Sequence, residues 1–114
     1  MIVDNISVFI PSKNFEISAE FYTDLGFVSD YVSDDLSIFA NGQCTFFLQR
    51  HYNQEFAENL MLQICVLNID LAYQSANSAR HKQKITGIKT EHWGKVFYIW
   101  GPSGELLHIT QLGC

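Results

Sequence analysis

Histidines and one pair of adjacent acids are the side chains best suited to chemistry in this sequence. Three of the four histidines lie in polar stretches typical of a protein surface: His51, His81 and His92. His108 lies in an apolar run, so its imidazole is either a hydrogen-bonding group on a cavity wall or a satisfied, half-buried side chain. Asp34 and Asp35 are adjacent in a predicted turn, and paired carboxylates favour a cationic partner.

The charge of the chain is divided unevenly between its two halves. The net charge is −5, but residues 1–58 hold nine acidic and two basic residues, whereas residues 59–114 hold three acidic and five basic ones. An acidic half has the wrong sign for a nucleic-acid backbone, so we expect no nucleic-acid partner. The same charge suits a cationic small molecule, or it belongs to a solvated acidic face.

The sequence has no feature that predicts export or a membrane. No apolar run reaches the roughly 20 residues that cross a bilayer, and the N-terminal segment carries Asp4 and no basic leader. The cysteines, which form no CxxC pair, are Cys44, Cys65 and Cys114. We therefore expect a cytoplasmic protein without disulfides, in which Cys44 and Cys65 are small buried residues of strands and not nucleophiles.

The predicted elements of the first half are one strand, one helix and three further strands. The helix begins near Asn14, which can cap it, and ends at Leu25 because Gly26 favours a left-handed stop. Asn41-Gly42 is a strong hairpin signal between the last two strands. The predicted strands are 5–10, 27–32, 36–40 and 43–50, and a polar stretch follows over 51–59.

The second half repeats this order. An acid at Asp70 opens a predicted helix that ends near Lys82. The predicted strands are 61–66, 85–89, 95–100 and 105–111. The repeat is also visible in the residues, because Ile38-Phe39 and Ile99-Trp100, displaced by 61 positions, each precede a glycine turn and a strand. We therefore predict a single α+β domain, residues 1–114, made of two tandem βαβββ modules over about 1–58 and 59–114.

Each predicted module is a four-stranded sheet with one helix, so one face of the sheet stays open. Two such modules placed edge to edge curve into a cup-shaped mixed sheet whose interior can hold a ligand. Open faces and strand edges also predict a homodimer, because a second chain can cover them.

Several segments resemble the vicinal oxygen chelate superfamily. IPSKNFEISAEFYTDLGF (residues 10–27), VLNIDLAY (66–73) and GPSGELLHI (101–109) are similar to its first helix, its second helix start and its last turn and strand. GFVSDYVSDDLSIFANGQCTFFL (26–48) and HWGKVFYIWGPSGELLHI (92–109) are most similar to the bleomycin-resistance proteins of that superfamily. The resemblance covers nearly the whole chain. It implies a dimer that sequesters a cationic drug in crevices between subunits and does no chemistry on it.

The resemblance also implies four metal-ligand positions, two in each module. In this sequence the residues there are Ser7, Phe47, Leu62 or a close neighbour, and His108. A divalent cation needs three or four donors, which one imidazole with a hydroxyl, a phenyl ring and an isobutyl group does not supply. Gln49 and Gln63 lie nearby, but a shift of one residue turns a strand side chain to the opposite face. We therefore predict no metal and no other cofactor.

The predicted ligand crevice depends on one tryptophan and the acidic pair. The resemblance implies that Trp93, in a Trp-Gly turn, stacks on the ligand; the other interpretation is a core or dimer-contact tryptophan. The drug-binding relatives follow the acidic pair with a second stacking aromatic. Here Leu36 follows it, which gives up about 0.5–1.5 kcal/mol of stacking. The crevice for a cationic or aromatic small molecule is predicted to contain Trp93, Leu36, Asp34, Asp35, His108, Phe47 and Ser7.

Two other functions stay open. One is a metal-dependent glyoxalase, dioxygenase or thiol transferase of the same superfamily, which would need the metal ligands that this sequence lacks. The other is a sensor or partner-binding module with no drug role. Because the metal-ligand positions are not retained, we favour a non-enzymatic binding protein.

Overall fold

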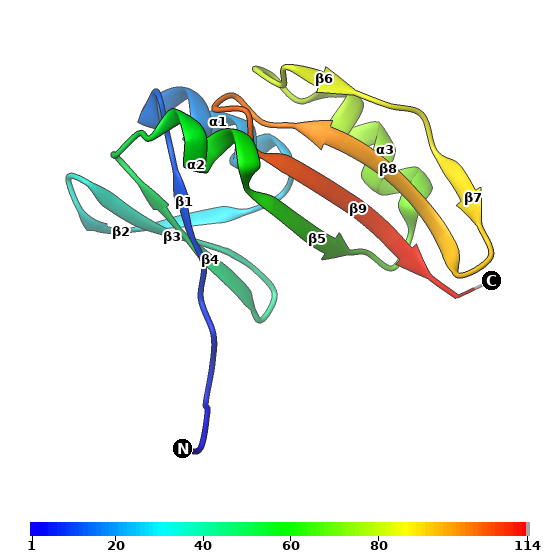
Figure 1. Ribbon diagram of the computed structural model, residues 1–114, viewed down its shortest axis with the longest axis horizontal. Helices are drawn as coiled ribbons and strands as arrows, with labels where there is room; N and C mark the ends of the chain where they lie inside the picture. Colours follow the sequence, from blue (N-terminus) through cyan, green and yellow to red (C-terminus); the bar gives the residue numbers. More distant parts are fainter. Residues whose placement is uncertain (114) are drawn as a thin grey trace.

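The first module contains one helix and a four-stranded sheet. Its elements are β1 (Phe9–Pro11), α1 (Phe15–Asp24), β2 (Val28–Ser33), β3 (Leu36–Asn41) and β4 (Cys44–Gln49). In the computed structural model, which describes residues 1–113, the strand order is β1-β4-β3-β2 and β1 is parallel to β4 (Figure 1). Cys114 lies outside the described residues. Asn14 caps α1 as predicted, because its side chain accepts a hydrogen bond from the backbone N–H of Ile17 at 3.1 Å.

The second module repeats this arrangement. Its elements are β5 (Met61–Cys65), α3 (Ile69–Ser78), β6 (Lys84–Ile85), β7 (Lys89–Glu91), β8 (Gly94–Trp100) and β9 (Leu106–Leu112). The sheet order is β5-β9-β8-β6, β7 also pairs with β8, and β5 is parallel to β9. The single weak strand predicted over 85–89 is divided between β6 and β7. The α+β class and the two tandem βαβββ modules are therefore confirmed, with the strands in two separate mixed sheets.

Helix α3 differs from the prediction at both ends. It begins after Asn68, whose side chain caps it, and ends at Ser78 before the predicted end at Lys82. The chain leaves the helix because the backbone and side chain of Arg80 both donate to Asp24 of α1, at 2.9 and 3.0 Å. A contact with the other module therefore overrides the local preference for helix.

The polar stretch between the modules contains a helix that was not predicted. This helix, α2 (Gln54–Asn59), is capped by Asn53, whose side chain accepts a hydrogen bond from the N–H of Phe56 at 2.9 Å. Only Ala57 of α2 is buried, so the segment lacks the apolar periodicity that reveals longer helices. Within the described chain, no helix has the length and apolar character needed to cross a membrane.

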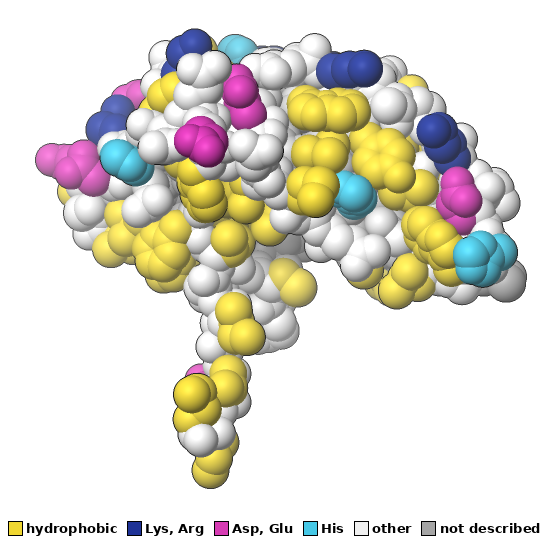
Figure 2. Space-filling model, viewed as in Figure 1, with side chains coloured by type: hydrophobic (Ala, Val, Ile, Leu, Met, Phe, Trp, Pro, Cys, Tyr) yellow, Lys and Arg dark blue, Asp and Glu magenta, His cyan; other side chains and the backbone are white. Residues whose placement is uncertain are grey.

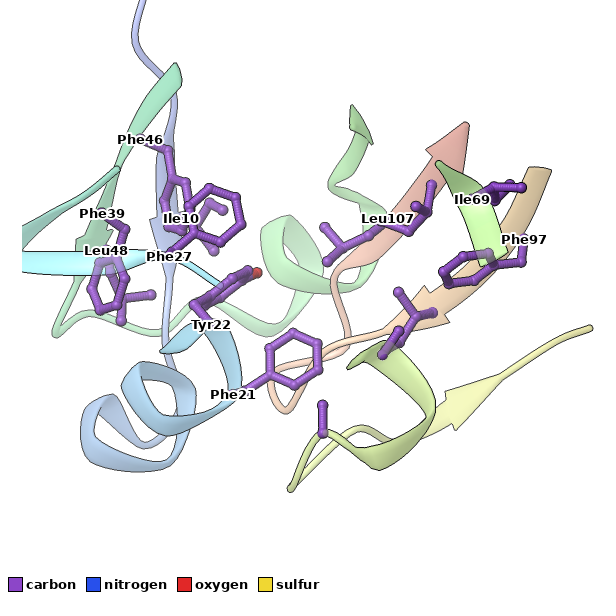
Figure 3. Close-up of a cluster of buried hydrophobic side chains, with 14 residues drawn as sticks. Ile10, Phe21, Tyr22, Phe27, Phe39, Phe46, Leu48, Ile69, Phe97 and Leu107 are labelled. Atoms are coloured by element: carbon purple, nitrogen blue, oxygen red, sulfur yellow. The ribbon is translucent and has the colours of Figure 1, made fainter. Parts of the chain in front are cut away.

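The core lies between the helices and one face of each sheet (Figure 3). In the first module it is largely aromatic, and the ring of Tyr22 packs edge-on against Phe21 and Phe46 at centroid distances of 5.0 and 4.8 Å. In the second module the residues facing α3 are mostly aliphatic, with Phe97 against Tyr73. Burying each large side chain contributes about 1.5–3 kcal/mol, so this cluster supplies most of the stability of the fold.

A buried carboxyl group joins the two modules. Glu105, in the turn before β9, is fully buried and accepts hydrogen bonds from the hydroxyl of Tyr22 at 2.7 Å and from the backbone N–H of Ser103 at 3.0 Å. Burial raises the pKa of Glu105, and the two hydrogen bonds lower it in part. Burial, followed by the nearby carboxylate, also raises the pKa of Tyr22 well above its usual value.

Residues 1–6 are exposed and extend away from the body of the molecule (Figure 1), whereas Val8 packs against the core. The predicted strand over 5–10 forms only at its end, as β1, together with a hydrogen bond from the N–H of Phe47 to the carbonyl of Val8 at 2.9 Å. Ile2, Val3 and Ile6 are exposed along this segment.

Candidate ligand-binding surface

The open face of the second sheet carries one histidine among apolar side chains. His108 of β9 lies opposite Tyr98 of β8 and opposite Gln63 of β5, so the three side chains share this face. The rings of Tyr98 and His108 meet edge-on, with centroids 4.9 Å apart. The Nε2 atom of His108 is buried and has no hydrogen-bond partner among the described residues. Buried polar atoms are usually hydrogen-bonded, so this one stands out, but a ligand would reach it only after neighbouring side chains move.

Apolar side chains surround this histidine. Trp100 and Leu106 lie opposite each other on the same face, and Met61 beside them is 63% exposed. The ammonium of Lys84 lies 5.1 Å from the centre of the Trp100 ring, a cation–π distance. Figure 2 shows hydrophobic side chains gathered over β5, β8 and β9. The face therefore offers flat apolar area with the polar groups of His108, Gln63 and Tyr98 within it and the ammonium of Lys84 at its edge.

The open face of the first sheet is also aromatic. Phe47 of β4 stacks on Phe9 of β1, with ring centroids 4.6 Å apart and planes 10° apart. Ile38 lies opposite Phe47 in the ladder and shares its face. Ser7 precedes Phe9 by two residues, and its hydroxyl accepts a hydrogen bond from the side chain of Asn5 at 3.3 Å. Phe47 and Ser7 thus belong to the first module's open face, and His108 to that of the second.

One of the residues predicted at a metal-ligand position faces the wrong way. Leu62 packs against the core, because Gln63 and not Leu62 is in register with His108. Met61 and Gln63 of β5 lie on the open face, because they are in register with Leu106 and His108. Across residues 1–113, no three histidines, cysteines or acids lie close enough to hold a metal ion. An imidazole and an amide beside a thioether do not form the donor set of a catalytic divalent metal.

The acidic pair lies at the turn between β2 and β3. Asp34 accepts a hydrogen bond from the hydroxyl of Tyr31 at 2.9 Å, and this bond raises the pKa of Tyr31. The guanidinium of Arg50 donates to the backbone carbonyl of Asp34 at 2.9 Å and pairs with Glu16 at 3.0 Å. Asp34 and Asp35 line a shallow hollow beside these residues. The turn keeps a negative balance, because Arg50 faces three carboxylates.

Leu36 lies on the open face of the first sheet and not in that hollow. Residues Leu36 and Ile38 alternate along β3 with buried Ser37 and Phe39, which face the helix. Leu36 is partly buried opposite Gln49. The acidic pair therefore borders the open face only at the end of the hairpin.

Trp93 lies at the tip of the turn between β7 and β8 and is 38% exposed. Its carbonyl accepts a hydrogen bond from the N–H of Gly113 at 3.0 Å. Gly94 has φ +148°, and a Cβ there would lie 2.2 Å from the carbonyl oxygen of Gln111, so only glycine fits next to the ring. The backbone thus fixes Trp93 at the end of the second sheet.

One chain does not assemble the predicted crevice. The turn that carries Trp93 and the turn that carries Asp34 and Asp35 lie at opposite ends of the molecule (Figure 1). The reason is that the modules lie beside each other, and the turn between β2 and β3 points away from the turn between β7 and β8. Trp93 and Leu36 can therefore line one crevice only if different chains supply them.

A groove between the modules was not predicted. Its volume is about 480 Å³, within the usual range of ligand sites. None of its lining side chains is charged, and its walls include Leu25, Phe27, Cys44, Cys65, Leu71 and Ala72. Cys44 and Cys65 are exposed free thiols, which corrects the prediction that both are buried. Because the groove forms only where two modules meet, no single segment of sequence signals it.

Known structures share this fold. A bleomycin resistance determinant encoded on the transposon Tn5 matches with a TM-score of 0.81 and 20% identity over 98% of this chain and 100% of that one. A bleomycin-binding protein complexed with bleomycin matches with 0.79 and 20%, over 97% and 100% of the two chains. TnmS3, an antibiotic binding protein from Streptomyces sp. CB03234, matches with 0.81 and 17%, over 99% of each chain. No protein-family profile and no curated protein matches the sequence. These likenesses confirm, at the level of fold, the resemblance predicted from the sequence.

Proposed function

We propose that this chain, which has the fold of the bleomycin-resistance proteins, binds and sequesters a cationic or aromatic small molecule without transforming it. The observation that carries the proposal is the chemistry of the two open faces. Both present flat apolar and aromatic area, and the polar groups on the second sheet's face include Gln63 and His108, whose Nε2 atom has no partner among the described residues. A surface of this kind suits binding, since apolar walls with a few polar groups are typical of ligand sites.

The proposal requires a homodimer. Trp93 and the acidic turn lie at opposite ends of one chain, and a two-fold axis between antiparallel copies would bring each end of one copy to the other end of its partner. Such an axis generates two equivalent crevices. In each, Trp93 of one copy would face Leu36, Asp34 and Asp35 of the other.

Each of these residues then has a distinct role. The face of Trp93 stacks on a planar group of the ligand or on its positive charge. Asp34 and Asp35 supply a negative field that favours a cation. His108 supplies one directional hydrogen bond once the side chains that cover its buried Nε2 atom move aside. None of these contacts requires a reaction. Phe47 and Ser7 form part of the opposing wall.

The structures with this fold support binding as the function. One neighbour holds bleomycin in its structure, and another is an antibiotic binding protein. The alternative, a metal-dependent enzyme of the glyoxalase or dioxygenase kind, would need more metal donors than His108 and Gln63 provide.

Ligand titration combined with metal analysis tests the proposal. Purified protein should be heated with bleomycin, with a planar organic cation and with a neutral aromatic compound. A ligand at 100 times its Kd stabilises the fold by about 2.7 kcal/mol, which raises the melting temperature measurably. Two results together would favour the enzyme alternative over this proposal. One is stoichiometric zinc, iron, nickel or manganese in protein purified without added metal. The other is metal-dependent turnover of a glutathione hemithioacetal.

A further inference from the structure

We propose that the groove between the modules is a second ligand site, which takes a neutral, largely apolar small molecule with an α,β-unsaturated carbonyl group, and that the thiol of Cys44 captures this molecule covalently. This inference goes beyond the proposed function, because the groove is separate from the open faces. It is carried by the position of the groove, by its uncharged lining and by the free thiols in its walls.

The groove lies on the helix side of the second sheet, opposite the face that carries His108. Its walls include Phe97 of β8 and Ile109 of β9, which alternate along their strands with Tyr98 and His108. Helix α3 forms another wall through Leu71. A ligand in the groove therefore leaves the open face free, so the two sites can be tested separately.

The lining of the groove favours a neutral ligand with mostly apolar surface. Leu67 and Leu71 are 99% and 60% exposed there, and an apolar ligand removes their side chains from water. The amide groups in the lining are already engaged: Asn41 donates to the carbonyl of Gly26 at 3.2 Å, and the oxygen of Asn68 caps α3. Since none of the described side chains in the lining is charged, an ionic ligand group would lose water without gaining a partner.

The first sheet directs the thiol of Cys44 toward the groove. Cys44 begins β4 two residues before Phe46, so the two side chains share one face of the strand. Phe46 is buried on that face, and its ring centroid lies 5.2 Å from that of Phe27, which lines the groove (Figure 3). Cys44 stays exposed because the sheet ends there. Cys65, the last residue of β5, instead shares the face of Gln63, so it serves as the comparison.

The capture step is an addition that needs no oxidant. The thiol of Cys44 loses its proton to solvent, because the thiolate is the reactive form of cysteine. The sulfur then forms a bond to the β-carbon of the unsaturated carbonyl compound, the carbon–carbon double bond becomes a single bond, and the α-carbon takes a proton from water. A molecule bound in the groove holds its β-carbon near the thiol, and this proximity raises the rate. Each ligand consumes one thiol, so the step does not need the adjacent base of a cysteine enzyme.

Labelling of the unmodified chain with two matched reagents tests the site. N-phenylmaleimide is neutral, and N-(4-carboxyphenyl)maleimide has nearly the same shape with a negative charge. Peptide mass spectrometry measures the rate at each cysteine, divided by the rate of the same reagent with N-acetylcysteine. The neutral reagent should be favoured over the anion by about tenfold more at Cys44 than at Cys65, because the carboxylate loses its hydration in the groove. An equal preference at the two cysteines, or a stronger one at Cys65, would overturn the proposal.

A compound that binds without reacting separates binding from mere accessibility. N-phenylsuccinimide has the shape of N-phenylmaleimide but lacks the carbon–carbon double bond. In excess it should slow the labelling of Cys44 and leave that of Cys65 unchanged. Absence of protection at Cys44 would show that its thiol is only accessible, and the proposal would fail. It would also fail if labelling of Cys44 slowed as the protein concentration rose, because a second copy of the chain would then cover the groove.

A substitution on α3 fills the groove. Ser75 is exposed and lines the groove, so Ser75→Phe adds a ring there without entering the core. The neutral reagent's preference for Cys44 should then fall toward its value at Cys65. The matched control is Gln74→Phe, which adds the same ring at an exposed position outside the lining and should keep the preference. Circular dichroism checks that both variants fold. A preference lost in both variants or kept in both would place the binding outside the groove.

Discussion

At the scale of single residues, Trp93 is the side chain whose removal should cost the most ligand affinity. Gly94 and the bond from Gly113 hold it at the tip of a turn, so the ring is preorganised for stacking. Trp93→Ala should weaken binding of a planar cation by about tenfold or more, equivalent to about 1.4 kcal/mol. Calorimetric titration measures the loss. The melting temperature should change little, and a variant that unfolds yet retains its residual affinity would identify Trp93 as a packing residue.

Leu36 offers the opposite test, a gain of affinity. It lies on the open face of the first sheet, where an aliphatic side chain lines the crevice without stacking. Leu36→Phe should strengthen binding of bleomycin by up to roughly tenfold, because an aromatic pair adds about 0.5–1.5 kcal/mol. Leu36→Met, which changes the side chain without adding a ring, is the matched control. Equal affinities of the two variants would remove the second stacking wall from the proposed crevice.

Sequence patterns placed some of these residues correctly and misplaced others for a physical reason. Leu62 and Gln63 differ by one position, and only pairing with β9 determines which of them faces the open side. Cys44 and Cys65 lie in strands as predicted, but they are exposed because each lies at a strand end beside the groove. Alternation along a strand predicts two faces and does not say where the sheet ends.

At the scale of elements, the contact between α1 and the turn before β9 predicts how stability depends on pH. Glu105 has a folded-state pKa above its ordinary value of 4.5, so the folded chain binds its proton more tightly than the unfolded chain. The stability that this group contributes is complete below about pH 4.5 and is lost as the pH rises through the folded-state pKa.

Replacement of this carboxyl removes that dependence. Glu105→Gln keeps an oxygen to accept from Ser103 and an amide that can donate to Tyr22. The free energy of unfolding of Glu105→Gln relative to the unmodified chain should therefore rise as the pH increases above about 4.5. Urea unfolding at a series of pH values measures this difference. Glu91→Gln, at an exposed carboxyl, is the control, and a difference that stays constant with pH would show that Glu105 does not titrate differently in the two states.

The elements themselves were largely predictable, because their signals are local. Asn14 and Gly26 mark the two ends of α1, and Asn41-Gly42 marks the hairpin between β3 and β4. The errors occur where distant residues decide. α3 stops where Arg80 meets Asp24 of the other module, and the first strand forms only where Phe9–Pro11 pairs with the end of β4.

At the scale of the whole molecule, the acidic turn should make binding sensitive to salt. Exposed charges are screened over about 8–10 Å at physiological ionic strength, so affinity for a cation should fall between low and physiological salt. Asp35→Asn should reduce that fall, and this variant keeps the bond between Tyr31 and Asp34. Titrations of a cationic and a neutral aromatic ligand at two salt concentrations measure the effect. If the affinity for the cation does not change with salt, the acidic pair is not part of the binding site, and the aromatic wall alone remains.

The crevice as a whole could not be predicted from one chain. The resemblance grouped Trp93 with Asp34, Asp35 and Leu36, but folding places these residues at opposite ends of the molecule. Whether they meet depends on how two copies associate, which leaves no periodic pattern in the sequence. The groove between the modules could not be predicted for a similar reason, because segments that are far apart in the sequence form its walls.

The buried contact between Tyr22 and Glu105 has a consequence for how the molecule melts. Both tryptophans, Trp93 and Trp100, belong to the second module, so fluorescence excited selectively at tryptophan follows that half alone, whereas circular dichroism follows the helices of both. A hydrogen bond buried across the junction makes each half costly to open without the other. The two spectroscopic signals should accordingly share one midpoint, as they do when a chain behaves as one cooperative unit.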